Sequence, residues 1–97
     1  MRIQGPALLA RIYIGESDRW EGRPLYQVIV EKLRAEGVAG ATVLRGIEGY
    51  GRAARVHTAQ VLRLSEDLTV LNEVVDREDR LRAIMPQIDA MVDGGLI

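Results

Sequence analysis

The eight residues ALLARIYI, numbered 7–14, alternate along an extended chain and decide the fold class. In a strand, successive side chains point to opposite faces, so every second residue shares a face. Leu9 and Tyr13 therefore lie on one face. The opposite face carries four apolar residues, Leu8, Ala10, Ile12 and Ile14. We predict a strand here, with the four-residue face buried.

Outward from this strand, residues 15–24 read as a loop because Gly, Ser, Asp and Pro are frequent in them. A helix is predicted over residues 24–36, since Pro24 suits a first helical turn and Gly37 suits a helix end. Its apolar stripe consists of Leu25, Val28, Ile29 and Leu33. Residues 41–47, ATVLRGI, are predicted as the second strand.

The second half of the chain repeats this order. The elements predicted in it are a short strand extension (61–64), a turn (65–67), a third strand (70–75) and a helix (77–92). Asp76 is predicted to cap this helix, and Pro86 to bend it. The buried stripe of the helix is Leu81, Ile84, Met85, Ile88 and Val92. Leu96 and Ile97 look like the start of a fourth strand that the chain does not complete.

The element order β-α-β, β-α-β predicts a single α+β domain over residues 1–97. Right-handed crossovers would give a ferredoxin-like, four-stranded antiparallel sheet with both helices on one face. The other face would then be bare, with Leu9 and Tyr13 on it. Apolar residues on a bare face favour a covering partner subunit.

Composition excludes several classes of protein. The chain has 97 residues, is 47% hydrophobic and 28% charged, and carries a net charge of -1. It therefore lacks a global field that would attract nucleic acid or anionic membrane, and its few aromatic residues make no stacking platform for bases. The absence of cysteine excludes disulfides. No apolar run has the length that spans a bilayer, so we expect a cytoplasmic protein that is not embedded in a membrane.

The stretch GIEGYGRAARVHTA, residues 46–59, is the strongest candidate for a binding site. Gly46, Gly49 and Gly51 would permit backbone angles closed to other residues, and exposed backbone N–H groups can hold an anion. Arg52 and Arg55 add guanidinium groups suited to phosphate or carboxylate. Residues 45–63 include four arginines and one acidic residue, so the net charge of this stretch is about +3. The alternative to a binding site is a β-bulge followed by a hairpin tip, in which the arginines are merely solvated.

Catalytic and metal chemistry find little support in the sequence. His57 is the only histidine, so we expect no metal site and no resident cofactor. The first loop contains Glu16, Asp18 and Trp20, and its two acids could act as a general acid and a general base. The simpler interpretation is that both acids are solvated and that Trp20 packs on the domain or on a neighbouring molecule. We expect a protein that is not an enzyme.

The run GVAGATVLRGIEGYGRAARVHTA (residues 37–59), with IYIGESDRW before it and LRLSEDLTVLNEVVD after it, resembles the bacterial and archaeal domain of unknown function 190 family. That family is described as PII-like, and the match covers nearly the whole chain. The resemblance implies a ferredoxin-like fold assembled as a homotrimer, with the sheets facing inward. It further implies a loop that inserts into partners such as membrane transporters or enzymes; the loop is long in PII proteins and shorter here, at about residues 49–68.

The resemblance also implies where a nucleotide would bind, in clefts between subunits near the base of that loop. Thr42 lies where PII proteins have a ligand-contacting threonine. The segment from Gly49 through Tyr50 and Gly51 to Arg52 is similar to their GFGR motif, which approaches phosphate. The turn after the second helix, residues 93–95, lacks the lysine that PII proteins use there.

Three functions follow as hypotheses. The first is a PII-like regulator that senses a small anionic ligand, most simply a nucleotide, through Thr42, residues 49–52 and Arg55. Arg55 and His57 would also belong to the loop that meets a protein partner. The second is an interaction module that binds its partner without a ligand. The third is a small enzyme that uses His57 with Glu16 or Asp18.

Overall fold

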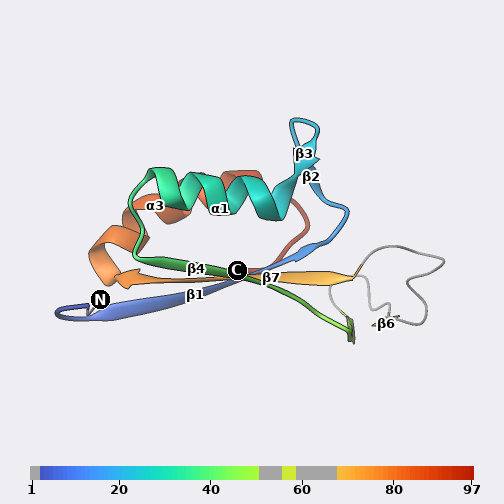
Figure 1. Ribbon diagram of the computed structural model, residues 1–97, viewed down its shortest axis with the longest axis horizontal. Coiled ribbons are helices and arrows are strands. Elements are labelled where there is room, and N and C mark those ends of the chain that lie inside the picture. Colours follow the sequence, from blue (N-terminus) through green and yellow to red (C-terminus); the bar gives the residue numbers. More distant parts are fainter. Residues whose placement is uncertain (1–2, 51–55, 59–67) are drawn as a thin grey trace.

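The computed structural model describes residues 3–50, 56–58 and 68–97 of the chain. Its main sheet has three antiparallel strands in the order β1-β7-β4. These strands are β1 (Ala7–Gly15), β7 (Thr69–Arg77) and β4 (Gly40–Arg45). Two helices, α1 (Leu25–Ala35) and α3 (Glu78–Met91), lie together over one face of this sheet (Figure 1). The molecule therefore has two layers, and one sheet face carries no helix.

The order of the strands is that of a ferredoxin-like fold without a full fourth strand. The predicted four-stranded sheet is not shown, and of its expected incomplete fourth strand the structure has a single bridge. Leu96 makes an isolated antiparallel bridge to Tyr13, on the edge of β1 away from β7. The N–H of Tyr13 donates to the Leu96 carbonyl at 2.7 Å, and the N–H of Leu96 donates to the Tyr13 carbonyl at 3.0 Å. One bonded residue pair makes a bridge and not a ladder, so the described sheet has three strands.

The hydrophobic core lies between the helices and the sheet, and the predicted periodicities locate it. The alternation in β1 is confirmed, because Ile12 and Ile14 are buried while Leu9 and Tyr13 are exposed. Both helical stripes are confirmed in the main, but Val28 is only half-buried and lies outside the core, and Met85 and Val92 are partly buried at its margin. The buried core cluster consists of Ile12, Ile14, Leu25, Ile29, Leu33, Val70, Val74, Leu81, Ile84 and Ile88. Burial of this one cluster is the main source of stability for so small a domain.

The segment predicted as a loop, residues 15–24, contains a small hairpin. Strand β2 (Arg19–Trp20) pairs with β3 (Arg23–Pro24). The two residues between them both have positive φ, 50° at Glu21 and 81° at Gly22. Two such residues in a row match the tight turn that joins twisted strands, and glycine adopts this conformation without strain. Because Pro24 ends β3, helix α1 begins one residue later than predicted.

The start of the second helix also differs from the prediction. Strand β7 continues to Arg77, so α3 begins at Glu78 and Asp76 is not its N-cap residue. The Asp76 carboxylate instead accepts hydrogen bonds from the backbone N–H groups of Arg77, at 2.6 Å, and Ala39, at 3.0 Å. Asp76 therefore joins the end of the central strand to the segment that precedes β4.

Beyond β4 the chain turns out of the main sheet. Strand β4 ends at Arg45, two residues before the predicted end, and Gly46 still donates to the Thr69 carbonyl at 2.7 Å. Strand β5 (Glu48–Tyr50) then bends away from the sheet on the side opposite the helices (Figure 1) and pairs with β6 (Val56–Thr58). The predicted strand over 61–64 and the turn over 65–67 lie outside the described residues.

Candidate functional site

The face of the main sheet opposite α1 and α3, here named the open face, is the most unusual surface of the described residues. The register of the three strands assigns residues to it in rows. One row is apolar and crosses the sheet through Tyr13, Leu71 and Leu44, and the bridge to Tyr13 adds Leu96 at its end. Leu9 and Val75 form a second apolar row beside Gly40. Exposed fractions of 48% at Leu9, 39% at Tyr13, 51% at Leu44 and 66% at Leu96 show that no part of the described chain covers this face.

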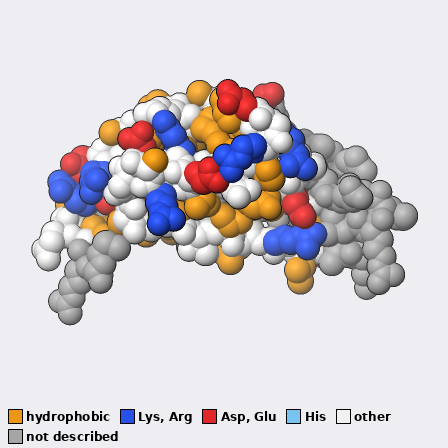
Figure 2. Space-filling model, turned by 45° about the horizontal axis from the view of Figure 1, so that its top comes forward, with side chains coloured by type: hydrophobic (Ala, Val, Ile, Leu, Met, Phe, Trp, Pro, Cys, Tyr) orange, Lys and Arg blue, Asp and Glu red, His pale blue; other side chains and the backbone are white. Residues whose placement is uncertain are grey.

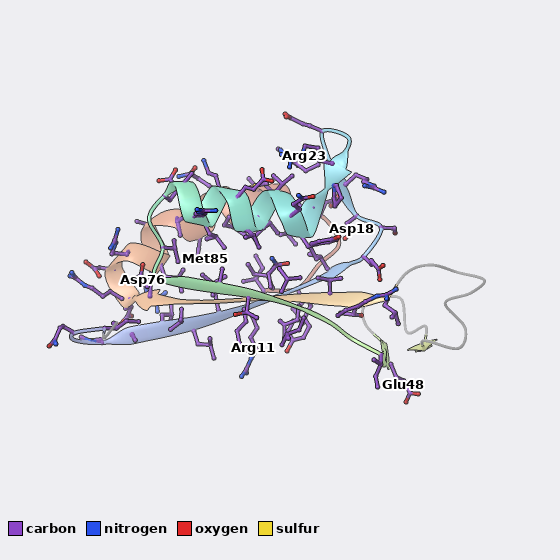
Figure 3. All side chains as sticks on the ribbon, viewed as in Figure 1. Arg11, Asp18, Arg23, Glu48, Asp76 and Met85 are labelled. Carbon is purple, nitrogen blue, oxygen red and sulfur yellow. The ribbon has the colours of Figure 1, made fainter. Side chains whose placement is uncertain are left out.

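A polar row separates these two apolar rows. Arg11 of β1, Glu73 of β7 and Thr42 of β4 lie directly opposite one another in the strand register. The Arg11 Nε lies 3.4 Å from the Glu73 Oε2. Figure 3 shows Arg11 projecting away from the helices. The side with the helices is different, because acidic and basic side chains there are interspersed around apolar ones (Figure 2).

A second cluster lies at the end of the sheet from which β5 departs. Arg45 donates from Nε to the Glu16 Oε2 at 2.6 Å, which links the end of β4 to the segment after β1. The Glu16 N–H donates to the Leu68 carbonyl at 2.8 Å. Asp18 accepts the Gly15 N–H at 2.9 Å through its side chain, and its carbonyl accepts the Leu25 N–H at 2.8 Å. The bonds of Glu16 hold the end of β4 and Leu68, the residue before β7, beside the segment that follows β1.

This cluster changes the interpretation of the charges near the loop. The guanidinium of Arg45 counted toward the local positive balance, but it is paired with Glu16. Glu16 and Asp18 in turn accept hydrogen bonds that shape the backbone or hold Arg45. The positions of the two acids are thus explained by structural contacts. Trp20 lies in β2 and is 37% exposed.

The unusual backbone angles expected of the glycines are absent at the two positions that the structure describes. Neither Gly46 nor Gly49 has a positive φ. A Cβ at Gly49 would meet nothing within 4 Å, so this position has room for a side chain. At Gly46 a Cβ would lie 3.1 Å from the Thr69 carbonyl oxygen. Gly46 is therefore explained by close approach to β7, and Gly51 lies outside the described residues.

The other predicted ligand residues fall into two groups. Thr42 is exposed on the open face, beside Glu73. Gly49 and Tyr50 lie in β5, where their backbones pair with His57 and Val56 of β6. Gly51, Arg52 and Arg55 lie outside the described residues. The structure thus brings Gly49, Tyr50 and His57 together in one hairpin and keeps Thr42 on the main sheet.

Asp76 is the buried carboxylate that sequence reasoning assigned only to a cap. Its pKa is lowered, chiefly by the hydrogen bond from the Arg77 N–H, with further contributions from the Ala39 N–H and from the charges of Arg80 and Arg77, while burial opposes them. Its side chain is 3% exposed, and Arg80 Nε lies 3.9 Å away. Asp76 is therefore a charged structural group and has no geometry for proton transfer to a substrate.

Sequence reasoning missed the polar row and the Arg45–Glu16 pair. The only local signal for the row was that Arg11 shares the face of Leu9 and Tyr13 in the alternating strand. Among residues 3–50, 56–58 and 68–97, no three His, Cys, Asp or Glu side chains gather as a metal site would require. No helix in that part of the chain is long and apolar enough to cross a membrane.

The arrangement defines a small α+β domain consistent with a ferredoxin-like fold, in which one sheet face is open. The chain belongs to the domain of unknown function 190 family (DUF190), described as Uncharacterized ACR, whose family model matches residues 7–97. It is 38% identical over 92 residues to a UPF0166 protein of Methanocaldococcus jannaschii, covering 94% of this chain and 84% of the relative. It is 32% identical over 94 residues to a UPF0166 protein of Aquifex aeolicus, covering 97% and 89%.

Proposed function

We propose that this protein is a non-enzymatic, PII-like regulator that acts in the cytoplasm as a homotrimer. Its ligand is a small anion, most simply a nucleotide, and its partner is another protein that meets the loop over residues 49–68. The resemblance to PII proteins is the source of the ligand class and of the number of subunits. The observation that carries the proposal is the open face, because an uncovered apolar sheet face needs a partner.

We propose that the ligand switches the loop over residues 49–68 between a ligand-free state and a state that meets the partner, and the route of the chain beyond β4 is compatible with this. Strands β4 and β7 belong to the rigid sheet, and both lead into the segment between residues 46 and 68. Its two ends are held by the Gly46–Thr69 and Glu16–Leu68 backbone bonds. A ligand that contacts residues 49–52 would bias the arrangement of this segment by its differential affinity for the two states.

The proposed roles are divided among the candidate residues. Gly49 and Gly51 would offer backbone N–H groups, Arg52 and Arg55 would supply positive charge, and Thr42 a hydroxyl group. The nucleotide is not proposed to be ATP in particular, because residues 93–95 contain no lysine.

The test is thermal unfolding of the purified protein with a panel of nucleotides (ATP, ADP, AMP, cyclic mono- and dinucleotides), with native mass spectrometry alongside. A ligand that binds only the folded state raises the melting temperature. At a concentration of 100 Kd the expected rise is roughly 10–20 °C for a domain of this size. A trimer that no nucleotide stabilises would contradict the nucleotide-sensing part of the proposal.

One observation favours a second candidate, the ligand-independent interaction module. Thr42 has Glu73 as its cross-strand neighbour. A carboxylate at that position disfavours an anion, although Arg11, whose Nε lies 3.4 Å from the Glu73 Oε2, offsets part of its charge. In this alternative the loop arginines pair with acidic groups on a protein partner. Equal capture of one defined partner with and without nucleotide would support it.

A further inference from the structure

We propose that the step from Asp93 to Gly94 is a site of spontaneous covalent modification, at which the main chain converts to an isoaspartyl linkage, and that this conversion releases Leu96 from β1. The inference goes beyond the proposed function and does not depend on it. The two residues lie in the short segment that joins the end of α3 to the bridge between Tyr13 and Leu96.

The chemistry requires an aspartate followed by a residue that does not shield its own backbone nitrogen. Glycine has no side chain, so the Gly94 nitrogen is open to approach from the Asp93 carboxyl group. This is the one Asp-Gly step in the sequence, because every other aspartate precedes arginine, leucine or alanine. Asp93 is therefore the aspartate whose neighbouring nitrogen is least hindered.

The structure leaves this step accessible. Helix α3 ends before residues 93–95, which belong to no helix or strand, and both Asp93 and Gly94 are exposed. Within the described part of the chain, no hydrogen bond or ion pair holds the Asp93 carboxylate, and no backbone bond holds the Gly94 N–H. Asp18 and Asp76 differ, because their carboxylates accept hydrogen bonds from backbone N–H groups.

The proposed reaction is an intramolecular condensation followed by hydrolysis. The Gly94 nitrogen attacks the Asp93 Cγ and forms an N–Cγ bond, a Cγ–O bond breaks, and the amide proton leaves with that oxygen as water. The product is a five-membered succinimide ring. Water then opens the ring by breaking one of the two bonds between a carbonyl carbon and the nitrogen. Opening at Cγ restores aspartate, whereas opening at the original backbone carbonyl leaves the main chain running through Cβ and Cγ, which is isoaspartate. Water is the co-reactant, and nothing is oxidised or reduced.

The extra backbone atom arises in a segment that is fixed at both ends. At one end the N–H of Val92 donates to carbonyl groups in the last turn of α3 at 3.2 Å. At the other end Leu96 is fixed by its two backbone bonds to Tyr13. Isoaspartate adds one carbon–carbon bond, about 1.5 Å, to the main chain. Residues 93–95 must accommodate this length between the two anchors.

The close packing at Gly95 prevents the segment from absorbing this change. An ideal Cβ at Gly95 would lie 2.6 Å from the Val92 Cγ1 and 2.7 Å from the Tyr13 carbonyl oxygen, so the backbone has no space to move toward either group. Val92 also packs against the core, whereas Leu96 is held by a single bonded pair. The bridge therefore breaks first, and β1 gains an unpaired edge of the kind that other chains can join.

The test is ageing of the purified protein at physiological temperature and neutral pH over several weeks. After proteolysis, mass spectrometry detects the succinimide as the loss of one water from the peptide that contains Asp93, and electron-transfer fragmentation distinguishes isoaspartate from aspartate. Isoaspartate at Asp93 should exceed that at every other aspartate at least about tenfold, because an intramolecular attack depends on an unhindered, well-placed nitrogen.

Hydrogen exchange measures the structural consequence. The N–H of Tyr13 donates to the Leu96 carbonyl at 2.7 Å. In the isoaspartyl fraction, separated by ion-exchange chromatography, this N–H should exchange at least about tenfold faster than in fresh protein. The N–H of Gly46 is the matched control, since it donates to the Thr69 carbonyl at the same distance of 2.7 Å beside β4. Its exchange should be unchanged.

Two variants test the chemical route. Asp93→Glu keeps the charge, but its attack would close a six-membered ring, so conversion should slow at least about tenfold. Asp93→Asn should convert faster than the wild type, because a neutral amide is attacked more readily than an ionised carboxylate and releases ammonia. Asp93 is exposed, and circular dichroism of the fresh variants verifies that each one folds.

The outcomes separate the two parts of the inference. Isoaspartate at Asp93 together with faster exchange of the Tyr13 N–H supports both. Aged wild type without isoaspartate at Asp93 would overturn the modification, and failure of Asp93→Asn to convert as well would assign the cause to the backbone of the step. Conversion with unchanged exchange of Tyr13 would overturn the release of Leu96. A failed nucleotide screen or a monomeric wild type contradicts the proposed function and leaves this inference intact.

Discussion

The carboxylate of Asp76 accepts a hydrogen bond from the backbone N–H of Ala39 at 3.0 Å, although the two residues are 37 positions apart. This bond ties the end of the central strand β7 to the residue before β4. Because the carboxylate is almost fully buried, it satisfies two backbone donors that would otherwise lose their bonds to water.

Asp76→Asn should lower the free energy of unfolding by about 1–3 kcal/mol, since an amide offers one acceptor atom where the carboxylate offers two. Urea denaturation measures this change. Asp79→Asn is the control, because the side chain of Asp79 is 67% exposed and pairs with the exposed guanidinium of Arg77. The control should change stability by less than about 0.5 kcal/mol. Equal effects of both variants would contradict the role of Asp76.

The free energy of unfolding should depend on pH through the ionisation of Asp76. Its pKa is lowered in the folded protein, chiefly by the Arg77 N–H, so the unfolded state takes up protons at a higher pH than the folded state. The stabilisation is therefore present above the pKa of the unfolded chain, about 4, and is lost as the pH falls through the lower folded value. Urea denaturation between pH 2 and pH 7 should show a steeper acid loss for the wild type than for Asp76→Asn. Parallel curves would contradict this assignment.

Gly95→Ala should destabilise the protein by about 1–3 kcal/mol, the usual effect of forcing an extra methyl group into a packed site. A Cβ at Gly95 would lie 2.6 Å from the Val92 Cγ1 and 2.7 Å from the Tyr13 carbonyl oxygen. Gly49→Ala is the matched control, since its Cβ would meet nothing within 4 Å. Thermal unfolding of both variants distinguishes a packing requirement from a general cost of replacing glycine.

Asn72 should tolerate an apolar replacement better than a charged one. Its Nδ2 donates to the Tyr26 carbonyl at 3.2 Å, while its Oδ1 is buried and has no hydrogen-bond partner among the described residues. Asn72→Leu removes both polar atoms and should change stability by less than about 1 kcal/mol. Asn72→Asp places a carboxylate against the Tyr26 carbonyl and should cost about 2 kcal/mol or more at neutral pH. Urea denaturation compares the two, and a reversed order would exclude this account.

Arg52→Ala tests whether Arg52 binds the proposed anionic ligand. Loss of a charge-assisted hydrogen bond should weaken the nucleotide found by the thermal screen about 10- to 100-fold. Isothermal titration calorimetry gives the affinity, and native mass spectrometry should show an unchanged assembly. Unaltered affinity would remove Arg52 from the site, whereas loss of assembly would assign it to the contact between copies.

The parts of the fold that the sequence predicted are those with a local period. The alternation of residues 7–14 and the stripe through Leu25, Ile29 and Leu33 recur within a few positions, and burial confirms both. Predictions that depended on single residues were weaker. Pro24 ends a strand and does not start the helix, and Asp76 bonds to Ala39 and does not act as the N-cap of α3.

By itself, then, the sequence determined the order of the elements and which face of each is apolar, because strand and helix periods are properties of short segments. Only the tertiary structure decided that Arg11 and Glu73, 62 positions apart, share one row between apolar rows. It also decided that Arg45 belongs with Glu16. The physical reason is strand register: the choice of β7 as the central strand pairs residues distant in the chain, and no local pattern encodes which residues will meet.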